Sequence, residues 1–99
     1  MKNLLFLEKI VKISNKGKDC PFNHTMEEAG EVIVECSKIV RNIGSSSKLL
    51  DELSDLFFQM LKILDRMGMD INVLIDRCIS KTVERFPEQI EEVENEKRN

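Results

Sequence analysis

Apolar residues recur along most of the chain at steps of three and four, the spacing that places side chains on one face of an α-helix. Short polar breaks rich in Gly, Ser and Asn separate the stretches that show this spacing. The pattern predicts four main helices, over residues 3–14, 25–43, 47–67 and 71–86. For the charged tail, 88–99, two alternatives stay open, a last turn or two of helix or a frayed end.

Local signals predict where these helices begin and end. Thr25 is followed three residues later by Glu28, which matches a capping box and predicts that the second helix begins there. Gly44 suits the position after the end of that helix, and Gly68 is expected to end the third helix. Asp70 is a suitable N-cap for the fourth helix.

The third predicted helix is apolar around most of its circumference, which indicates a central place in the fold. Glu52 and Asp55 share the narrow polar strip that remains, so both carboxylates face the same way and are only partly solvated. Charged groups in such a place need a cation or hydrogen-bond donors nearby. The two carboxylates on this strip are therefore candidates for a functional site, while the rest of the helix is expected to pack in the core.

Short connections between long helices favour antiparallel neighbours. We therefore expect a single all-α domain over residues 1–99, an antiparallel bundle of four main helices. The third helix carries more apolar surface than its partners in one chain can cover, which predicts a homodimer formed through the third and fourth helices.

Composition supports a helical, intracellular protein. The chain has only 5 aromatic residues, all Phe, with 4 Gly and 2 Pro, and its net charge of -3 argues against nucleic acid as a partner. Cys20, Cys36 and Cys78 form no Cys-x-x-Cys pair, so we expect reduced thiols in the cytoplasm, with Cys36 and Cys78 as small core residues. No apolar run reaches the length of a membrane span.

Two pairs of acids stand one helical turn apart: Glu28 with Glu31, and Glu52 with Asp55. If the second and third helices pack antiparallel, the pairs can converge, and four carboxylates so close would raise one another's pKa values. A divalent cation reverses that repulsion, and oxygen-only ligands favour Mg²⁺, with Mn²⁺ as a substitute. Mg²⁺ completes its shell with substrate phosphates, which points to phosphoryl-group hydrolysis.

A solvated helix face is the competing interpretation of either acidic pair taken alone. Glu27 and Glu35 fit that interpretation, or at best a helping role outside the metal ligands. Cys20 and His24 suggest a zinc site or a thiol nucleophile, but no further ligands stand at a recognised spacing. The carboxylates are therefore the stronger candidates for chemistry.

Two segments carry a family resemblance: Met26–Val32 reads MEEAGEV, and Glu52–Gln59 reads ELSDLFFQ after a spacer. Together they resemble the MazG family of nucleoside triphosphate pyrophosphohydrolases, whose pattern is Glu-x-x-Glu, a variable spacer and Glu-x-x-Asp. The resemblance covers about residues 20–87. It implies an all-α dimer, with tetramers as a further assembly.

By the same resemblance, Mg²⁺ is bound by Glu28, Glu31, Glu52 and Asp55, and these acids form the catalytic centre. The implied reaction is attack of a metal-activated water on the α-phosphorus of a nucleoside triphosphate. Its products are a nucleoside monophosphate and pyrophosphate. Base, sugar and the acid that takes the water's proton stay open.

The chain departs from the family pattern in several places, among them Ser54, which replaces the glycine of the second acidic motif. A family Cys-Pro-Trp-Asp segment appears here as CPFN at Cys20–Asn23, so the acid of that segment is lost. Downstream, Ile79 replaces a family Asn, while Lys81 and Arg85 are kept four residues apart on one helix face. Those two cations are candidates for binding substrate phosphates, with a salt-bridged surface as the equal alternative.

Two other functions remain open. Phosphoribosyl-ATP pyrophosphohydrolase belongs to the same superfamily and has a similar acidic pattern. From a different class, the chain could be a non-catalytic helical dimer that binds another protein, its acids vestigial. A response of stability to Mg²⁺ separates that last hypothesis from the two enzymatic ones.

Overall fold

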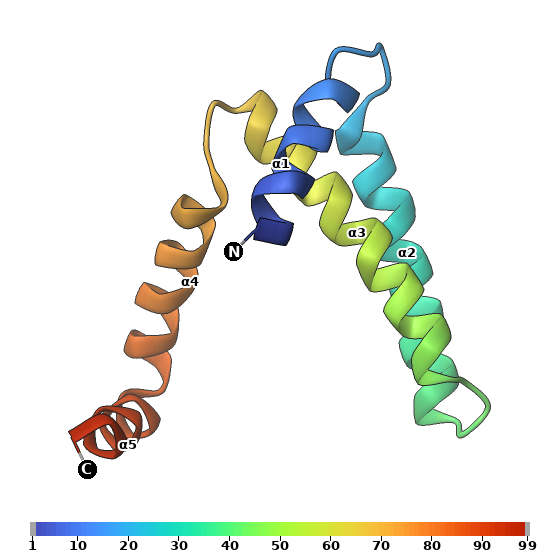
Figure 1. Ribbon diagram of the computed structural model, residues 1–99. Helices are drawn as coiled ribbons and strands as arrows, with labels where there is room; N and C mark the ends of the chain where they lie inside the picture. Colours follow the sequence, from blue (N-terminus) through green and yellow to red (C-terminus); the bar gives the residue numbers. More distant parts are fainter. Residues whose placement is uncertain (1, 99) are drawn as a thin grey trace. The chain divides into compact units, whose positions relative to one another are not determined.

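The computed structural model describes residues 2–98, and within that range every regular element is a helix, which confirms the all-α prediction (Figure 1). The helices are α1 (Lys2–Ser14), α2 (Pro21–Val40), α3 (Ser46–Arg66), α4 (Ile71–Arg85) and α5 (Pro87–Arg98). The charged tail forms a helix of its own, 12 residues long from Pro87, which exceeds the last turn or two of helix that the sequence suggested and is not frayed.

The chain divides into two compact units at the junction of Met69 and Asp70. The first contains α1, α2 and α3, and the second contains α4 and α5. Asp70 caps α4 as predicted, since its carboxylate accepts a hydrogen bond from the backbone N–H of Asn72 at 2.8 Å. The single domain, the four-helix bundle and the homodimer stay predictions.

Helices α2 and α3 run antiparallel side by side as a hairpin (Figure 1). The left-handed residue that ends α2 is Asn42, with φ of 61°, so the prediction that Gly44 has this role was wrong. Asn adopts the left-handed conformation more readily than most residues, because its short polar side chain can hydrogen-bond to the nearby backbone. Ser45 then caps α3, its hydroxyl accepting a hydrogen bond from the N–H of Lys48 at 3.2 Å.

The start of α2 also differs from the prediction. The helix begins at Pro21, four residues before Thr25, and Cys20 is its N-cap without a side-chain hydrogen bond. Proline fits the first helical position because its fixed φ is helical and the N–H it lacks would have no partner there. Thr25 therefore lies inside the helix, and the capping box is not formed.

Helix α1 packs on α3, where Val11 and Leu61 are buried. Beside them Lys62 is only 2% exposed and forms an ion pair with Asp19, from the loop that leads into α2. Asn15 joins the same network by donating to the carbonyl of Lys62 at 3.0 Å. Arg66 donates to the carbonyl of Asp19 at 2.8 Å. This network ties the entry of α2 to the end of α3.

Several apolar positions that the helical pattern assigned to the core are at the surface. Cys36 and Cys78 are both exposed, so the prediction that they are core residues was wrong. Because α2 packs mainly against α3, the far edge of its apolar seam stays outside the contact. Apolar side chains on α3 and α4 are exposed too, among them Leu50 (64%) and Ile79 (55%).

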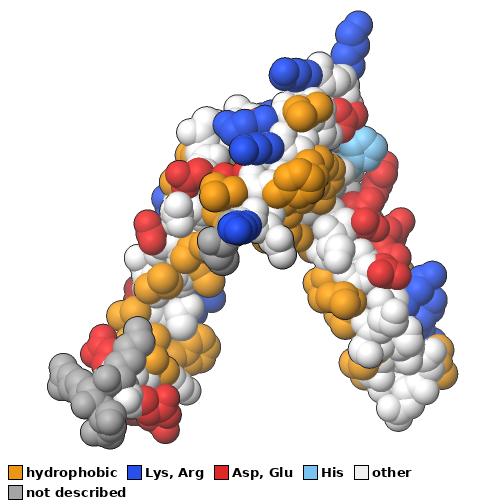
Figure 2. Space-filling view, in the orientation of Figure 1, with side chains coloured by type: hydrophobic (Ala, Val, Ile, Leu, Met, Phe, Trp, Pro, Cys, Tyr) orange, Lys and Arg blue, Asp and Glu red, His pale blue; other side chains and the backbone are white. Residues whose placement is uncertain are grey.

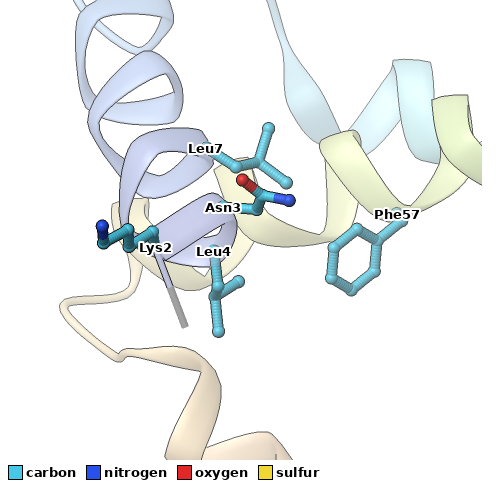
Figure 3. A pocket seen from close by; sticks show the side chains of 5 residues that line it. All are labelled: Lys2, Asn3, Leu4, Leu7 and Phe57. Atoms are coloured by element: carbon cyan, nitrogen blue, oxygen red, sulfur yellow. The ribbon is translucent and has the colours of Figure 1, made fainter.

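An open apolar groove of about 540 Å³ lies between α1 and α3 (Figure 3). Its lining comprises Lys2, Asn3, Leu4, Leu7 and Phe57. No acidic side chain is among these lining residues. None of the described helices is long and apolar enough to cross a membrane.

Candidate metal centre

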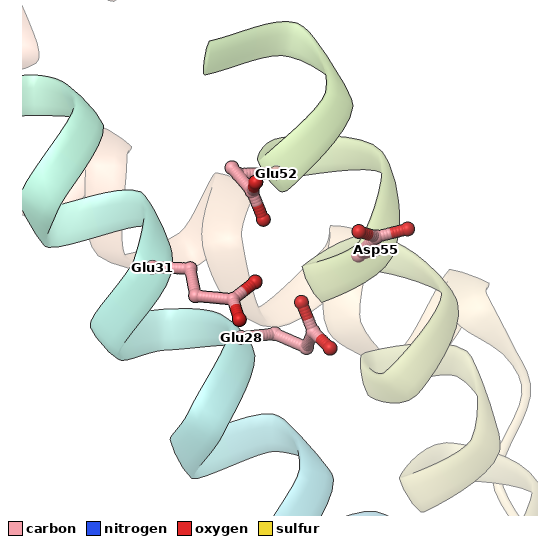
Figure 4. A group of neighbouring side chains, drawn as sticks. All are labelled: Glu28, Glu31, Glu52 and Asp55. Atoms are coloured by element: carbon pink, nitrogen blue, oxygen red, sulfur yellow. The ribbon is translucent and has the colours of Figure 1, made fainter. Parts of the chain in front are cut away.

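The α2–α3 hairpin brings the two acidic pairs together (Figure 4). Glu28 and Glu31 project from α2, and Glu52 and Asp55 project toward them from α3. One carboxylate oxygen from each of the four residues lies within 4.8 Å of the others. We call this group the acid cluster. Its geometry can hold a single hard cation.

Antiparallel packing explains the arrangement. Residues three apart on a helix face the same way, one turn above the other. Because α3 runs opposite to α2, Glu31 lies beside Glu52, while Glu28 lies toward Asp55 (Figure 4). The two spacings therefore match across the contact, and the hairpin alone builds the cluster.

Two atoms of the cluster are buried without a hydrogen-bond partner in the described part of the chain, Oε2 of Glu28 and Oε2 of Glu52. Both residues are half-buried, whereas Glu31 and Asp55 are exposed. A buried carboxylate oxygen with no partner is destabilising. The donor set therefore fits a cation, which would satisfy both atoms at once.

The electrostatics of the acid cluster also favour a bound cation. The pKa of Glu52 is raised above its usual value by a hydrogen bond with Glu31, which needs a proton on one of the two carboxyls. Burial and the charges of Glu31 and Asp55 add to this rise, and the charge of Lys48 opposes it. Without a cation the cluster thus resists full ionisation.

Glu52→Gln should raise the unfolding temperature of the metal-free protein at neutral pH. A carboxyl with a raised folded-state pKa destabilises the fold when it is ionised, so an uncharged amide removes that cost. Mg²⁺ should raise the unfolding temperature of the wild type and have a smaller effect on the variant. Thermal unfolding in chelator and in Mg²⁺ measures both effects. A wild type indifferent to Mg²⁺ would contradict the metal assignment.

Two further polar groups extend the cluster toward the start of α2. Thr25 lies one turn before Glu28, and Gln59 lies one turn after Asp55. Their atoms Oγ1 and Oε1 are buried without a partner among the described residues. Neither residue was among the site residues predicted from the sequence. The spacing of Gln59 from Asp55, four residues within the ELSDLFFQ segment, was the available signal.

On the side of the acid cluster away from Thr25 and Gln59, Glu31 and Glu52 also line an open groove of about 690 Å³ between α2 and α3. Glu35 lines it and is only 6% exposed, so the expectation of a solvated carboxylate was wrong. Its Oε2 accepts a hydrogen bond from Nζ of Lys38 at 3.3 Å. Lys48 lines the groove from α3. Neither lysine was a sequence-based candidate.

The remaining candidates lie elsewhere. Lys81 and Arg85 stand four residues apart on α4, in the second unit, and both are exposed. His24 lies in the first turn of α2, with Nδ1 3.5 Å from the carboxylate of Glu27. Among the described residues, neither Cys20 nor His24 belongs to a group that could hold a metal.

Comparison with known proteins finds a matching family and a relative. Residues 20–95 match the MazG nucleotide pyrophosphohydrolase domain. The chain is 35% identical over 66 residues to a phosphoribosyl-ATP pyrophosphatase from Methanosphaerula palustris. That similarity covers 67% of this chain and 62% of the relative, so the chain spans less than two thirds of the relative's length. No solved structure matches.

Proposed function

The chain belongs to the MazG family of nucleotide pyrophosphohydrolases, and from this premise we propose that it hydrolyses ribo- or deoxynucleoside triphosphates to the monophosphate and pyrophosphate. The substrates are canonical or damaged nucleotides. The proposed cofactor is Mg²⁺, with Mn²⁺ as a substitute. The acid cluster, Glu28, Glu31, Glu52 and Asp55, is the proposed metal site and catalytic centre.

The observation that carries this proposal is the convergence of the four carboxylates, with buried oxygens of Glu28 and Glu52 left without partners. Hard divalent cations prefer such oxygen ligands, and Mg²⁺ keeps positions for substrate phosphates. When bound, the cation would neutralise phosphate charge and lower the pKa of a water. The four carboxylates would hold it at the boundary between α2 and α3.

The proposed reaction is a displacement at the α-phosphorus. The oxygen of a water forms a bond to that phosphorus, and the bond to the oxygen that bridges to the β-phosphorus breaks. The electron pair of that bond leaves with pyrophosphate, and a carboxylate of the acid cluster accepts the water's proton. The exposed position of Asp55 and Glu31 allows that proton to pass on to solvent.

We also propose that Lys81 and Arg85 bind substrate phosphates. Their spacing places both cations on one side of α4, and both are exposed. The resemblance to the family pattern at these two positions supports the proposal. Charged donors form stronger hydrogen bonds to phosphate than neutral ones do.

A second candidate substrate is phosphoribosyl-ATP. The similarity to a phosphoribosyl-ATP pyrophosphatase favours it, and the same acid cluster would serve. The proposed assembly is a homodimer, with a tetramer as a further step, and exposed apolar residues such as Leu50 and Ile79 support it. The three exposed free cysteines fit a reducing compartment, for which we propose the cytoplasm.

Pyrophosphate release tests this function. Ribo- and deoxynucleoside triphosphates and phosphoribosyl-ATP are each incubated with Mg²⁺ and with chelator. We expect release only with the metal, because the carboxylates alone repel the substrate. If phosphoribosyl-ATP alone reacts, the second candidate replaces the first. No release from any substrate, with no effect of Mg²⁺ on stability, would favour the non-catalytic binding protein.

A further inference from the structure

The groove next to the acid cluster carries two lysines that have no role in the proposed reaction. Two of its lining residues, Glu31 and Glu52, belong to the cluster. Beyond them it is lined by Glu27, Gly30, Val34, Glu35 and Lys38 from α2 and by Lys48 from α3. We call it the lysine groove. In the space-filling view, acidic side chains along this edge of the first unit give way to basic ones (Figure 2).

Gly30 is unexpected in the middle of a 20-residue helix, because glycine is the poorest helix former after proline. Packing within the chain does not require it, since a Cβ built there would meet no atom within 4 Å. Its backbone has an ordinary negative φ, so no turn requires it either. What the glycine provides is open room on the wall of the lysine groove, as a close approach of a ligand requires.

Lys38 is held at this groove by a buried partner. The side chain of Glu35 is 7% exposed and that of Lys38 is 40% exposed, and the two lie 3.3 Å apart. A buried carboxylate needs a cation, so Glu35 fixes the ammonium group of Lys38 in place. An ammonium group has three donors, of which this contact uses one. The others are available to an anion in the groove.

Lys48 supplies a second positive charge from the opposite helix. It stands one turn before Glu52 and forms no ion pair with the residues that the structure describes. At 1.5 Å per residue, Lys48 lies about 6 Å from Glu52 along α3, and Lys38 lies about 10 Å from Glu31 along α2. Positive charge thus continues outward from the metal site in two steps.

Resting on the proposed function, we propose that the lysine groove binds the β- and γ-phosphates of the substrate, which become the departing pyrophosphate. Lys48 contacts the phosphate next to the acid cluster, and Lys38, positioned by Glu35, contacts the terminal one. Gly30 keeps the wall clear for them. A diphosphate would not reach Lys38, so the groove selects a triphosphate.

Binding of pyrophosphate tests the groove apart from hydrolysis. Calorimetric titration with pyrophosphate and Mg²⁺ is compared for the wild type, Lys38→Gln, Gly30→Leu and Lys9→Gln, an exposed lysine of α1 as the matched control. Losing one charged contact should weaken binding about tenfold for Lys38→Gln, with Lys9→Gln unchanged. Gly30→Leu should weaken binding at least as much while its unfolding temperature rises, because leucine favours the helix and its Cβ would meet no atom within 4 Å.

Hydrolysis and sedimentation complete the test. Lys38→Gln should raise KM for the triphosphate, because its contact with the terminal phosphate is lost. Unaltered pyrophosphate binding in Lys38→Gln and Gly30→Leu would overturn the proposed role of the lysine groove, even if the wild type hydrolyses triphosphates. A change of oligomeric state in Gly30→Leu without a change in binding would also overturn it, because the room would then serve a second copy. A wild type that binds pyrophosphate but hydrolyses nothing would contradict the proposed function alone.

Discussion

Glu52→Gln should reduce metal-dependent pyrophosphate release by at least about a thousandfold, because it removes a ligand charge worth several kcal/mol in the transition state. Glu52 carries a buried oxygen without a partner and lies against Glu31. Replacing its carboxylate by an amide keeps the shape of the side chain and removes the charge. The loss should appear in kcat as well as in kcat/KM, because the cation acts on the reacting phosphorus.

Asp51→Asn is the matched control, since Asp51 is an exposed neighbour of Glu52 that belongs neither to the acid cluster nor to the lysine groove. Its activity should equal that of the wild type. Circular dichroism should show that both variants keep the helical fold. An active Glu52→Gln would remove Glu52 from the metal site, whatever its effect on stability.

Asp19→Ala should be strongly destabilising, lowering the unfolding temperature by on the order of 10 °C. It leaves the ammonium group of Lys62, 2% exposed, without its anion and 6.0 Å from the ring centre of Phe58. The cation–π contact with Phe58 is too weak to replace an ion pair. Thermal unfolding at neutral pH measures the loss.

Adding Lys62→Met to Asp19→Ala should recover most of that stability, because methionine fills the same buried space without a charge. Lys62→Met alone should be milder than Asp19→Ala, since Asp19 keeps Arg66 at 3.9 Å and is partly exposed. If the double variant is no more stable than Asp19→Ala, the burial of the ammonium group is not the cause.

Low pH should weaken the ion pair between Lys62 and Asp19. The hydrogen bond from Lys62, followed by the charge of that residue, holds the pKa of Asp19 below its ordinary 3.8. Because the folded-state pKa is depressed, this contribution to stability is complete at neutral pH. It is lost as the pH falls below about 4. Asp19→Ala should therefore show a shallower loss of stability in that acid range than the wild type.

The helices could be predicted from the sequence because they follow the apolar spacing, which packing enforces. The third helix was predicted over 47–67 and found at Ser46–Arg66, with Gly68 at φ of 72° just after it. Helix ends were less predictable where two local signals compete. At the start of α2, the backbone preference of Pro21 overrode the capping box that Thr25 offered.

The acid cluster could also be predicted, because two equal spacings on antiparallel helices leave few arrangements. The burial of individual side chains could not be predicted from the sequence. Glu35 looked like a solvated carboxylate, and only the structure shows that it lies under Lys38 beside α3. Cys36 looked like a core residue, but its side of α2 faces away from the main contact. Such outcomes depend on which helix faces are covered, and spacing within one helix does not carry that information.

The acid cluster is contained in one helical hairpin, α2 and α3 with a short connection between them. Its four residues are therefore near one another along the chain as well as in space, and little chain entropy is lost when they meet. Contacts of this local kind form quickly in folding. The geometry of the acid cluster thus depends on how α3 packs on α2, because all four of its residues belong to these two helices.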